Sequence, residues 1–175
     1  DGVLARAHAI HFRAPYTTNV DFRKAVNSGE INYTDIHLSQ VAQRLRSGFL
    51  GHVTTAIIEA CELTADGRIY LTAGVGISPT IARLADRVIV ELNAAHSKSL
   101  IGVHDLYEME RPPYRRPIPI VRPSDRIGLP YIQVDPAKIV GVVEVNLPDE
   151  ARGFHDPDPV TDKIGQNVAD FLAAD

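Results

Sequence analysis

The sequence predicts an α/β domain whose mixed sheet is flanked by helices. Two apolar runs rich in β-branched residues, 53–60 and 87–93, alternate with segments in which apolar residues recur every three or four positions. Asp66-Gly67, a dipeptide typical of hairpin turns, stands between the first run and the apolar segment 68–72, so an antiparallel pair is expected in the same sheet. With 45% hydrophobic and 23% charged residues, the chain has enough apolar content for one core. Strands interleaved with helices indicate the α/β class.

Two helices are expected before the first long strand. The first covers 21–26, with Thr18 or Asn19 as its N-cap and Gly29 just beyond its end. The second is amphipathic and ends before Gly48. Its apolar side is formed by Leu38, Val41, Ala42 and Leu45. This side is expected to pack against another part of the domain.

The middle of the chain is expected to supply the centre of the sheet. Segment 53–60 is apolar almost throughout, which is the pattern of a strand covered on both faces. Asp66-Gly67 favours a tight turn of the primed type. A short helix then begins with Ser78 as its cap and Pro79 as its first residue, and it runs through Leu84.

The last third of the chain combines a proline-rich segment, a strand and a helix. Half of the 12 prolines fall within 111–130, which excludes a helix or a central strand there and predicts an ordered excursion or a lid. A buried strand is expected over 138–145. A final helix is predicted with Asp158 as its cap and Pro159 at its first position. Its apolar stripe comprises Val160, Ile164, Val168, Phe171 and Leu172.

Charge and composition disfavour several functional classes. Lys and Arg number 18 against 22 Asp and Glu, a formal net charge of −4, so no overall positive field exists for nucleic acid or an anionic membrane. No segment approaches the roughly 18 to 20 apolar residues of a membrane helix, and no signal peptide pattern is present. The single cysteine, Cys61, cannot form an internal disulfide, which favours the reducing cytoplasm. Small molecules or proteins are the expected partners.

Both ends of the sequence are expected to be internal points of a longer chain. The only methionine is Met109, and the last helix reaches Asp175 without a glycine or proline terminator. Residues 1–175 are therefore interpreted as one domain truncated at both ends.

The segment from Leu71 to Thr80 carries the most informative local pattern, because a strand leads into two glycines and then into a helix. Glycines let a backbone approach a ligand, and free amides at a helix start attract phosphate or carboxylate groups. The third glycine of a dinucleotide fingerprint is missing and Pro79 stands near its place, which argues against a nicotinamide cofactor. From the residues alone, a structural turn and a ligand loop are both open interpretations.

Other chemistry-bearing side chains have plainer interpretations. Four carboxylates in or next to predicted strands fit solvated or salt-bridged groups better than a nucleophile or general base: Glu59, Glu62, Glu91 and Glu144. The seven histidines are scattered, with His8 and His11 the only close pair, so no metal site is predicted. Cys61 is expected to be a buried apolar residue. No serine stands in a nucleophile-elbow motif.

Clustered arginines mark the proline-rich segment. The cluster comprises Arg111, Arg115, Arg116, Arg122 and Arg126, together with Tyr107 and Tyr114. Guanidinium groups could hold the phosphates of a nucleotide-like ligand, and a proline-rich stretch could dock a protein. A solvated loop whose arginines pair with acidic residues is the third interpretation.

Several motifs follow one another in the order of a known family. They are Tyr33-Thr-Asp35-Ile-His37-Leu-Ser39, the run 45–60, and the segments 66–67, 76–79, 85–93, 102–107, 125–128 and 135–140. Together they resemble the N-terminal domain of the acetyl-CoA hydrolase/transferase family, which comprises class I coenzyme A transferases acting on acetate, succinate, butyrate and related acids. The resemblance covers the chain from Tyr16 onward.

The resemblance implies one half of a two-domain enzyme. In that family a glutamate attacks the acyl-CoA thioester to give an acyl-glutamyl anhydride, and coenzyme A returns to form a glutamyl-CoA thioester that the acceptor carboxylate resolves. That glutamate belongs to the second domain, so no catalytic residue is assigned here and the fragment alone is expected to be inactive. Coenzyme A enters as substrate, and neither a covalently bound cofactor nor a metal is expected. The implied partners are an acyl-CoA, a short-chain carboxylate, the C-terminal domain and, in the full-length protein, a second copy.

Residue pattern and resemblance converge on one binding segment. The turn is expected to bind CoA or a carboxylate, with Asn93 as a polar neighbour and His104 and Arg126 as further candidates. The turn residues in question are Gly74, Val75, Gly76, Ile77 and Ser78. Ile77 stands where the family commonly has asparagine, which argues against a polar role for that side chain. The alternative function is a non-catalytic interaction module that docks a protein through 111–130, and transferase and hydrolase are not distinguished.

Overall fold

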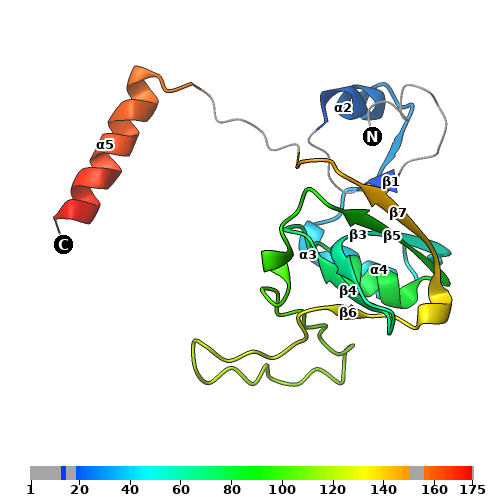
Figure 1. Ribbon diagram of the computed structural model, residues 1–175. Coiled ribbons are helices and arrows are strands. Elements are labelled where there is room, and N and C mark those ends of the chain that lie inside the picture. The colour runs from blue at the N-terminus through cyan, green and yellow to red at the C-terminus, as the bar shows by residue number, and fades with distance from the viewer. Residues whose placement is uncertain (1–12, 15–18, 150–155, 175) are drawn as a thin grey trace.

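The computed structural model describes residues 13–14, 19–149 and 156–174. Its centre is a five-stranded mixed sheet with the strand order β6-β4-β3-β5-β7 (Figure 1). In that order the strands span Ile132–Gln133, Arg68–Leu71, Thr55–Leu63, Arg87–Asn93 and Ile139–Val145. A separate parallel pair is formed by β1 (Arg13–Ala14) and β2 (Asn32–Tyr33). The predicted α/β class with a mixed sheet is confirmed.

Strand β3 lies in the middle of the sheet, as its apolar composition predicts. It pairs in parallel with β5, which pairs in parallel with β7. On its other side β3 pairs antiparallel with β4, and β4 pairs antiparallel with β6. Glu59 of β3 lies beside Glu91 of β5, and Ala60 lies opposite Leu71 of β4. The second half of β3 and the C-terminal ends of β4 and β5 therefore meet in one region of the sheet.

Four helices accompany the strands in the part of the chain that is described. They are α2 (Val20–Asn27), α3 (Leu38–Arg46), α4 (Ser78–Leu84) and α5 (Pro159–Ala173), with short 3-10 helices η1 (Lys98–Leu100) and η2 (Pro136–Lys138). Asn19 caps α2 by accepting a hydrogen bond from the backbone N–H of Phe22 at 3.0 Å. Asp158 caps α5 by accepting from the backbone N–H groups of Val160 and Thr161. Both caps were among the predicted candidates.

The core lies on one face of the sheet. Helix α4 packs on β3, and α3 packs on α4. Alternate side chains of β3, β4 and β5 point to this face and are buried there. With the residues of α4 and the chain around β6 they form one cluster: Ala56, Ile58, Ala60, Ile69, Leu71, Ala82, Ala85, Val88, Val90, Ile132 and Val134.

The opposite face of the sheet is open. Ile57 is 65% exposed, whereas its neighbour Ile58 is 1% exposed. The prediction that this strand is covered on both faces is therefore wrong for the described chain. Strand β7, predicted to be buried, is an edge strand on which Val140, Val142 and Val143 are exposed.

The hairpin between β3 and β4 differs from its prediction in turn type. The backbone N–H of Gly67 donates to the carbonyl of Thr64 at 3.0 Å, so the turn is centred on 65–66 and not on 66–67. Gly67 follows the turn with a φ of +83°, a conformation that favours glycine. A Cβ at this position would also collide with the carbonyl group of Val134. The glycine is thus required by both backbone conformation and close packing.

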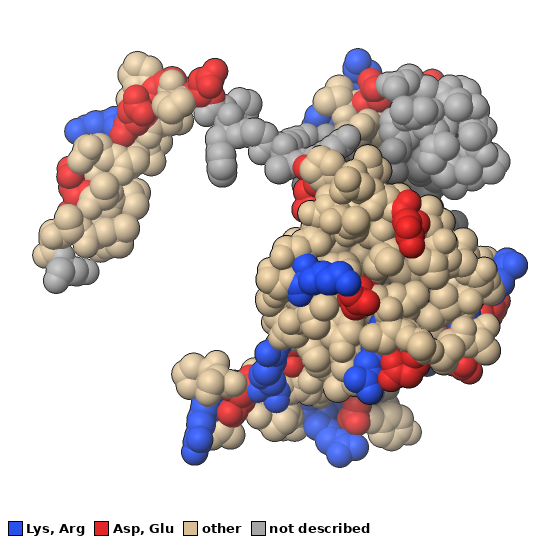
Figure 2. Space-filling model, in the orientation of Figure 1, with Lys and Arg blue, Asp and Glu red and all other residues tan. Residues whose placement is uncertain are grey.

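The proline-rich segment 111–130 contains no helix or strand, as predicted. Figure 1 shows it as an extended loop at the lower end of the molecule, and a bridge between Leu106 and Leu129 closes its base. Basic and acidic side chains are interleaved over this end in Figure 2. On the face shown, neither sign of charge forms a large continuous surface there.

Helix α5 lies apart from the sheet (Figure 1). Its predicted apolar stripe is present, and each of its members is more than half exposed: Val160, Ile164, Val168, Phe171 and Leu172. None of the helices in the described ranges is both long enough and apolar enough to span a membrane.

Candidate functional site

The glycine turn, residues 74–78, leads from the end of β4 into α4. Open space surrounds the positions where a Cβ would lie at Gly74 and Gly76, and Gly76 adopts a φ of +49°. Packing therefore does not require a glycine at position 74, and the open side leaves room for another molecule to approach the backbone. Ser78 was predicted to cap α4, but Ile77 occupies the cap position and Ser78 is the first helical residue.

The backbone of the glycine turn carries unused hydrogen-bond donors. Among the described residues, no acceptor faces the N–H groups of Gly74, Val75, Gly76 and Ile77, whereas the N–H of Ser78 donates to the carbonyl of Val75 at 3.1 Å. Successive free amides make a concave, electropositive surface that suits a carboxylate, a phosphate or a developing oxyanion. The turn thus has the donors that the sequence led us to expect at a ligand loop.

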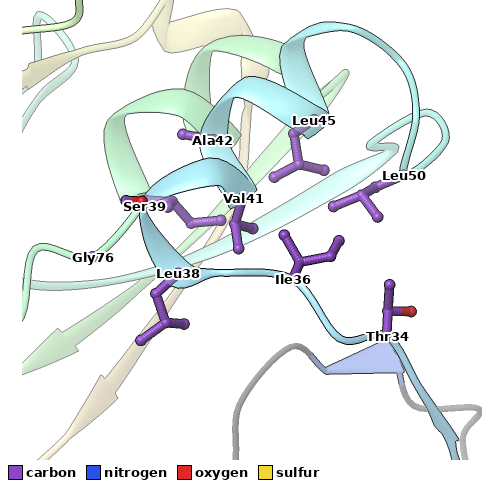
Figure 3. Close-up of a pocket in the computed structure, with 10 residues that line it drawn as sticks. Thr34, Ile36, Leu38, Ser39, Val41, Ala42, Leu45, Leu50 and Gly76 are labelled. Carbon is purple, nitrogen blue, oxygen red and sulfur yellow. The ribbon is translucent and has the colours of Figure 1, made fainter.

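An apolar groove runs along one side of the glycine turn. Its volume is about 790 Å³. Figure 3 shows side chains of α3 and of the preceding segment converging on it, with Gly76 at its edge. The lining residues are Thr34, Ile36, Leu38, Ser39, Val41, Ala42, Leu45, Leu50, Gly76 and Ile77. The apolar side of α3, predicted to pack on another part of the domain, thus also forms the wall of an open groove.

A second, more polar hollow of about 310 Å³ adjoins the same turn. It shares Gly76 and Ile77 with the groove and adds Arg46 of α3 and Arg115 of the proline-rich segment. Arg46 Nη1 donates to the carbonyl of Met109 at 2.6 Å, but its buried Nε has no partner within the described structure. Arg115 Nη2 donates to Gln43 Oε1 at 3.2 Å. Two guanidinium groups therefore face a hollow next to four free amides.

Glu59 is the centre of a hydrogen-bond network behind the glycine turn. Its Oε1 accepts from Asn93 Nδ2 at 2.7 Å, and its Oε2 accepts from Thr72 Oγ1 at 2.8 Å. Burial raises the pKa of Glu59, but these two hydrogen bonds and the nearby His96 lower it, and the net shift is downward. Glu59 is therefore a fixed, ionised carboxylate, closer to the salt-bridged group than to the solvated group or nucleophile considered from the sequence.

Asn93 extends this network to the end of the sheet. Besides Glu59, its Nδ2 donates to the carbonyl of Leu147 at 2.8 Å, and its Oδ1 accepts from the backbone N–H of Leu147 at 3.1 Å. The side chain is 3% exposed and lines neither hollow. The geometry gives Asn93 a structural role at the strand end, and ligand contact by this residue stays a prediction.

His104 and Arg126 anchor the chain near the turn. His104 Nε2 lies 2.7 Å from the carbonyl oxygen of Thr72, two residues before Gly74. Arg126 Nη2 lies within 3.0 Å of three consecutive carbonyl oxygens, those of Gly102, Val103 and His104. Both side chains thus engage the backbone, and ligand contact by either of them stays a prediction.

Several further candidates line neither hollow, whereas Tyr107 lines the second one. Glu62 pairs with Lys98 at 2.6 Å and Arg116 with Glu110 at 3.2 Å, as expected for surface ion pairs. Cys61 is buried, and this burial raises the pKa of its thiol, so it fits the apolar residue that was predicted. His8 and His11 lie outside the described residues. The sequence analysis did not single out Arg46 or His96 as site residues: Arg46 is one of several polar residues on its helix, and His96 stands in none of the quoted motifs.

Comparison with known proteins bears on these observations. Residues 1–144 match the profile of the acetyl-CoA hydrolase/transferase N-terminal domain. The propanoyl-CoA:succinate CoA transferase of Escherichia coli is 42% identical over 98% of this chain and 35% of that protein. The succinyl-CoA:acetate CoA-transferase of Clostridium kluyveri is 41% identical over 98% of the chain and 32% of that protein. The acetyl-CoA hydrolase of Schizosaccharomyces pombe is 39% identical over 96% of the chain and 33% of that protein.

A solved structure supports the fold independently. RipA from Yersinia pestis superposes with a TM-score of 0.56 at 18% identity, over 92% of this chain and 32% of that one. The chain spans about a third of the length of the curated relatives it matches. On the profile match over most of its length, the chain belongs to the acetyl-CoA hydrolase/transferase family, as an N-terminal domain.

Proposed function

We propose that this chain supplies the N-terminal half of an acyl-CoA site. The complete enzyme would move coenzyme A between a short-chain acyl-CoA and a carboxylate such as acetate or succinate, or would hydrolyse the thioester. The observation that carries this proposal is the glycine turn: it has free amides, and its residues Gly76 and Ile77 line both the apolar groove and the hollow that Arg46 and Arg115 also line. The names of the relatives, CoA transferases and acetyl-CoA hydrolases, support the same chemistry.

Each part of the site suits one part of an acyl-CoA reaction. When a nucleophile attacks a thioester, negative charge develops on the carbonyl oxygen, and fixed N–H donors stabilise that charge. The free amides of Gly76 and Ile77 are such donors. The apolar groove can take the acyl chain or the apolar arm of CoA. Arg46 and Arg115 can pair with the carboxylate or with a phosphate group.

The covalent steps we propose require a nucleophile from the second domain. A glutamate carboxylate attacks the thioester carbonyl, the C–S bond breaks, and an acyl-glutamyl anhydride and CoA thiolate result. The thiolate attacks the glutamyl carbonyl, which releases the acyl carboxylate and leaves a glutamyl-CoA thioester. Glu59 is not assigned this role, because both of its oxygens accept hydrogen bonds from side chains of this chain.

The open face of the sheet supports a second domain in the complete protein. Ile57 is 65% exposed on this face, although the strand that carries it is apolar almost throughout. Apolar surface of this kind marks a site of association. We propose that the C-terminal domain covers it, that the complete enzyme forms homo-oligomers, and that it works in the cytoplasm.

The test compares two glycine variants of the full-length protein. Gly76→Ala and Gly29→Ala each place a Cβ in open space at a residue of positive φ, +49° and +81°. Both should cost about 1–2 kcal/mol of backbone strain. Of these two glycines, only Gly76 lines the hollows. Only Gly76→Ala should therefore lower kcat/KM for acetyl-CoA with succinate, by about tenfold or more. Equal activity of the two variants would contradict the assignment.

The same assay separates the two reactions. Acetyl-CoA is supplied with succinate, with acetate as an exchange acceptor, or with water alone, and succinyl-CoA and free CoA are measured. A transferase forms succinyl-CoA faster than free CoA, and a hydrolase forms free CoA at the same rate in all three mixtures. Failure to turn over any acyl-CoA would refute the proposed function.

A further inference from the structure

Three potential metal ligands meet beside the end of the sheet. Glu59 lies on β3, His96 follows β5 and Asp149 follows β7, so strand pairing brings them together although they are far apart in the sequence. His96 Nε2 is 3.4 Å from Glu59 Oε1 and 3.5 Å from Asp149 Oδ1. One donor atom from each residue lies within 4.8 Å of the other two.

The nitrogen at the centre of this group is buried and unsatisfied. The His96 side chain is 10% exposed, and its Nε2 has no hydrogen-bond partner in the described structure. Hydrogen bonds from N–H to oxygen normally span about 2.7–3.2 Å, which is shorter than either separation here. A buried polar nitrogen without a hydrogen-bond partner is uncommon, and an ion placed between it and the two carboxylates would satisfy it.

Two of the three separations match those around a small ion, and the third, between Glu59 and Asp149, is at most 4.8 Å. Zn²⁺ bonds to histidine nitrogen and carboxylate oxygen at about 2.0–2.2 Å, so ligands in a tetrahedron lie about 3.3–3.5 Å apart. Both distances from His96 fall in this range. Asp149 is 63% exposed, which leaves solvent access for a water molecule at a fourth position. One imidazole and two carboxylates form a donor set typical of transition metals.

Neighbouring residues hold the ligands in place. Thr72 and Asn93 donate to the two oxygens of Glu59, and Oε1 keeps a second lone pair free. Asn93 also binds the backbone of Leu147 twice, which positions the segment leading to Asp149. The backbone N–H of His96 donates to the carbonyl of Asn93 at 3.3 Å. Such supporting contacts are usual around metal ligands.

We propose that Glu59, His96 and Asp149 bind one divalent transition-metal ion of the Zn²⁺ class. Mg²⁺ and Ca²⁺ prefer shells made of oxygen alone and fit this donor set less well. The sequence predicted no metal site, because these ligands form no spacing motif. The ion would tie the ends of β3, β5 and β7 together, and the proposal does not depend on the proposed activity.

The test is calorimetric titration of the full-length, chelator-stripped protein with ZnCl₂, MgCl₂ and CaCl₂. The wild type should bind one equivalent of Zn²⁺ per chain at least tenfold more tightly than Mg²⁺ or Ca²⁺. His96→Gln and Asp149→Asn should each weaken this equivalent at least tenfold. Asp149 is largely exposed, so its variant keeps the test valid if His96→Gln folds poorly. Visible absorption of bound Co²⁺ supplies a second readout of nitrogen and oxygen ligation.

His52→Gln is the matched control, because His52 is an exposed histidine whose Nε2 lies 2.7 Å from Asp86 Oδ2, far from this cluster in sequence. It should bind Zn²⁺ as the wild type does. The proposal is overturned if the wild type binds no Zn²⁺ equivalent, if both ligand variants retain it unchanged, or if His52→Gln loses it instead.

Discussion

Two neighbouring isoleucines on β3, Ile57 and Ile58, point to opposite faces of the sheet, so truncating each one tests whether its face is covered. Ile58 is 1% exposed on the core face, and Ile57 is 65% exposed on the open face. Truncating a buried isoleucine to alanine costs about 2–5 kcal/mol, because apolar contacts are lost and a cavity remains. An exposed truncation usually changes stability by less than about 0.5 kcal/mol. For a domain of this size, a 3 kcal/mol loss lowers Tm by about 6–12 °C.

The assay is thermal unfolding of Ile58→Ala and Ile57→Ala in the 175-residue chain and in the full-length protein. In the chain, Ile58→Ala should lower Tm by about 6–12 °C and Ile57→Ala by less than about 2 °C. In the full-length protein the difference between the two Tm losses should be smaller, because the proposed second domain covers Ile57. Equal losses for both variants in the chain would refute the assignment of the two faces. If this difference in Tm loss were the same in the full-length protein as in the chain, coverage of Ile57 by the second domain would be refuted.

Three further perturbations test single contacts. Asn93→Ala removes hydrogen bonds to an ionised carboxylate and to a backbone carbonyl at 2.7 and 2.8 Å and should cost about 3 kcal/mol in urea unfolding. Gly67→Ala should prevent stable folding or lower Tm steeply, since its Cβ would strike Val134. The backbone N–H groups of Ile127 and Gly128 lower the pKa of Asp105, so its stabilisation is present above the unfolded pKa of about 3.9 and is lost as pH falls through the lower folded value. Asp105→Asn should therefore flatten the stability-pH curve at the acidic end.

The periodicity of apolar residues and the helix-capping residues were sufficient to predict most of the helices and strands. The predicted span 87–93 coincides with β5, and Asn19 and Asp158 cap helices as their side-chain oxygens allow. Three short strands, β1, β2 and β6, were missed, because a strand of two residues is too short to show a pattern of alternating apolar and polar residues. The turn at 65–66 was placed one residue late, because glycine after a turn and glycine inside it give the same dipeptide.

The candidate site could be predicted only in part, because a site is a set of contacts between distant segments. The glycine turn is a continuous segment of the chain, so it can be predicted from its own residues. Arg46 and Arg115 face the same hollow from α3 and from the proline-rich segment, and no spacing in the sequence relates them. Glu59 and His96 meet only because β3 and β5 pair side by side. Strand order therefore determines these groupings, and the sequence pattern did not specify it.

The two errors about burial have a common physical cause. Both Ile57 on β3 and Val143 on β7 were expected to be buried, and both are at least half exposed. Apolar composition reflects the surface that a segment buries in the complete protein, and this chain spans about a third of its relatives' length. We therefore propose that segments which look buried in sequence but are exposed in the chain map the surface where the rest of the protein packs. By the same reasoning the stripe of α5, with Phe171 71% exposed, belongs to that surface.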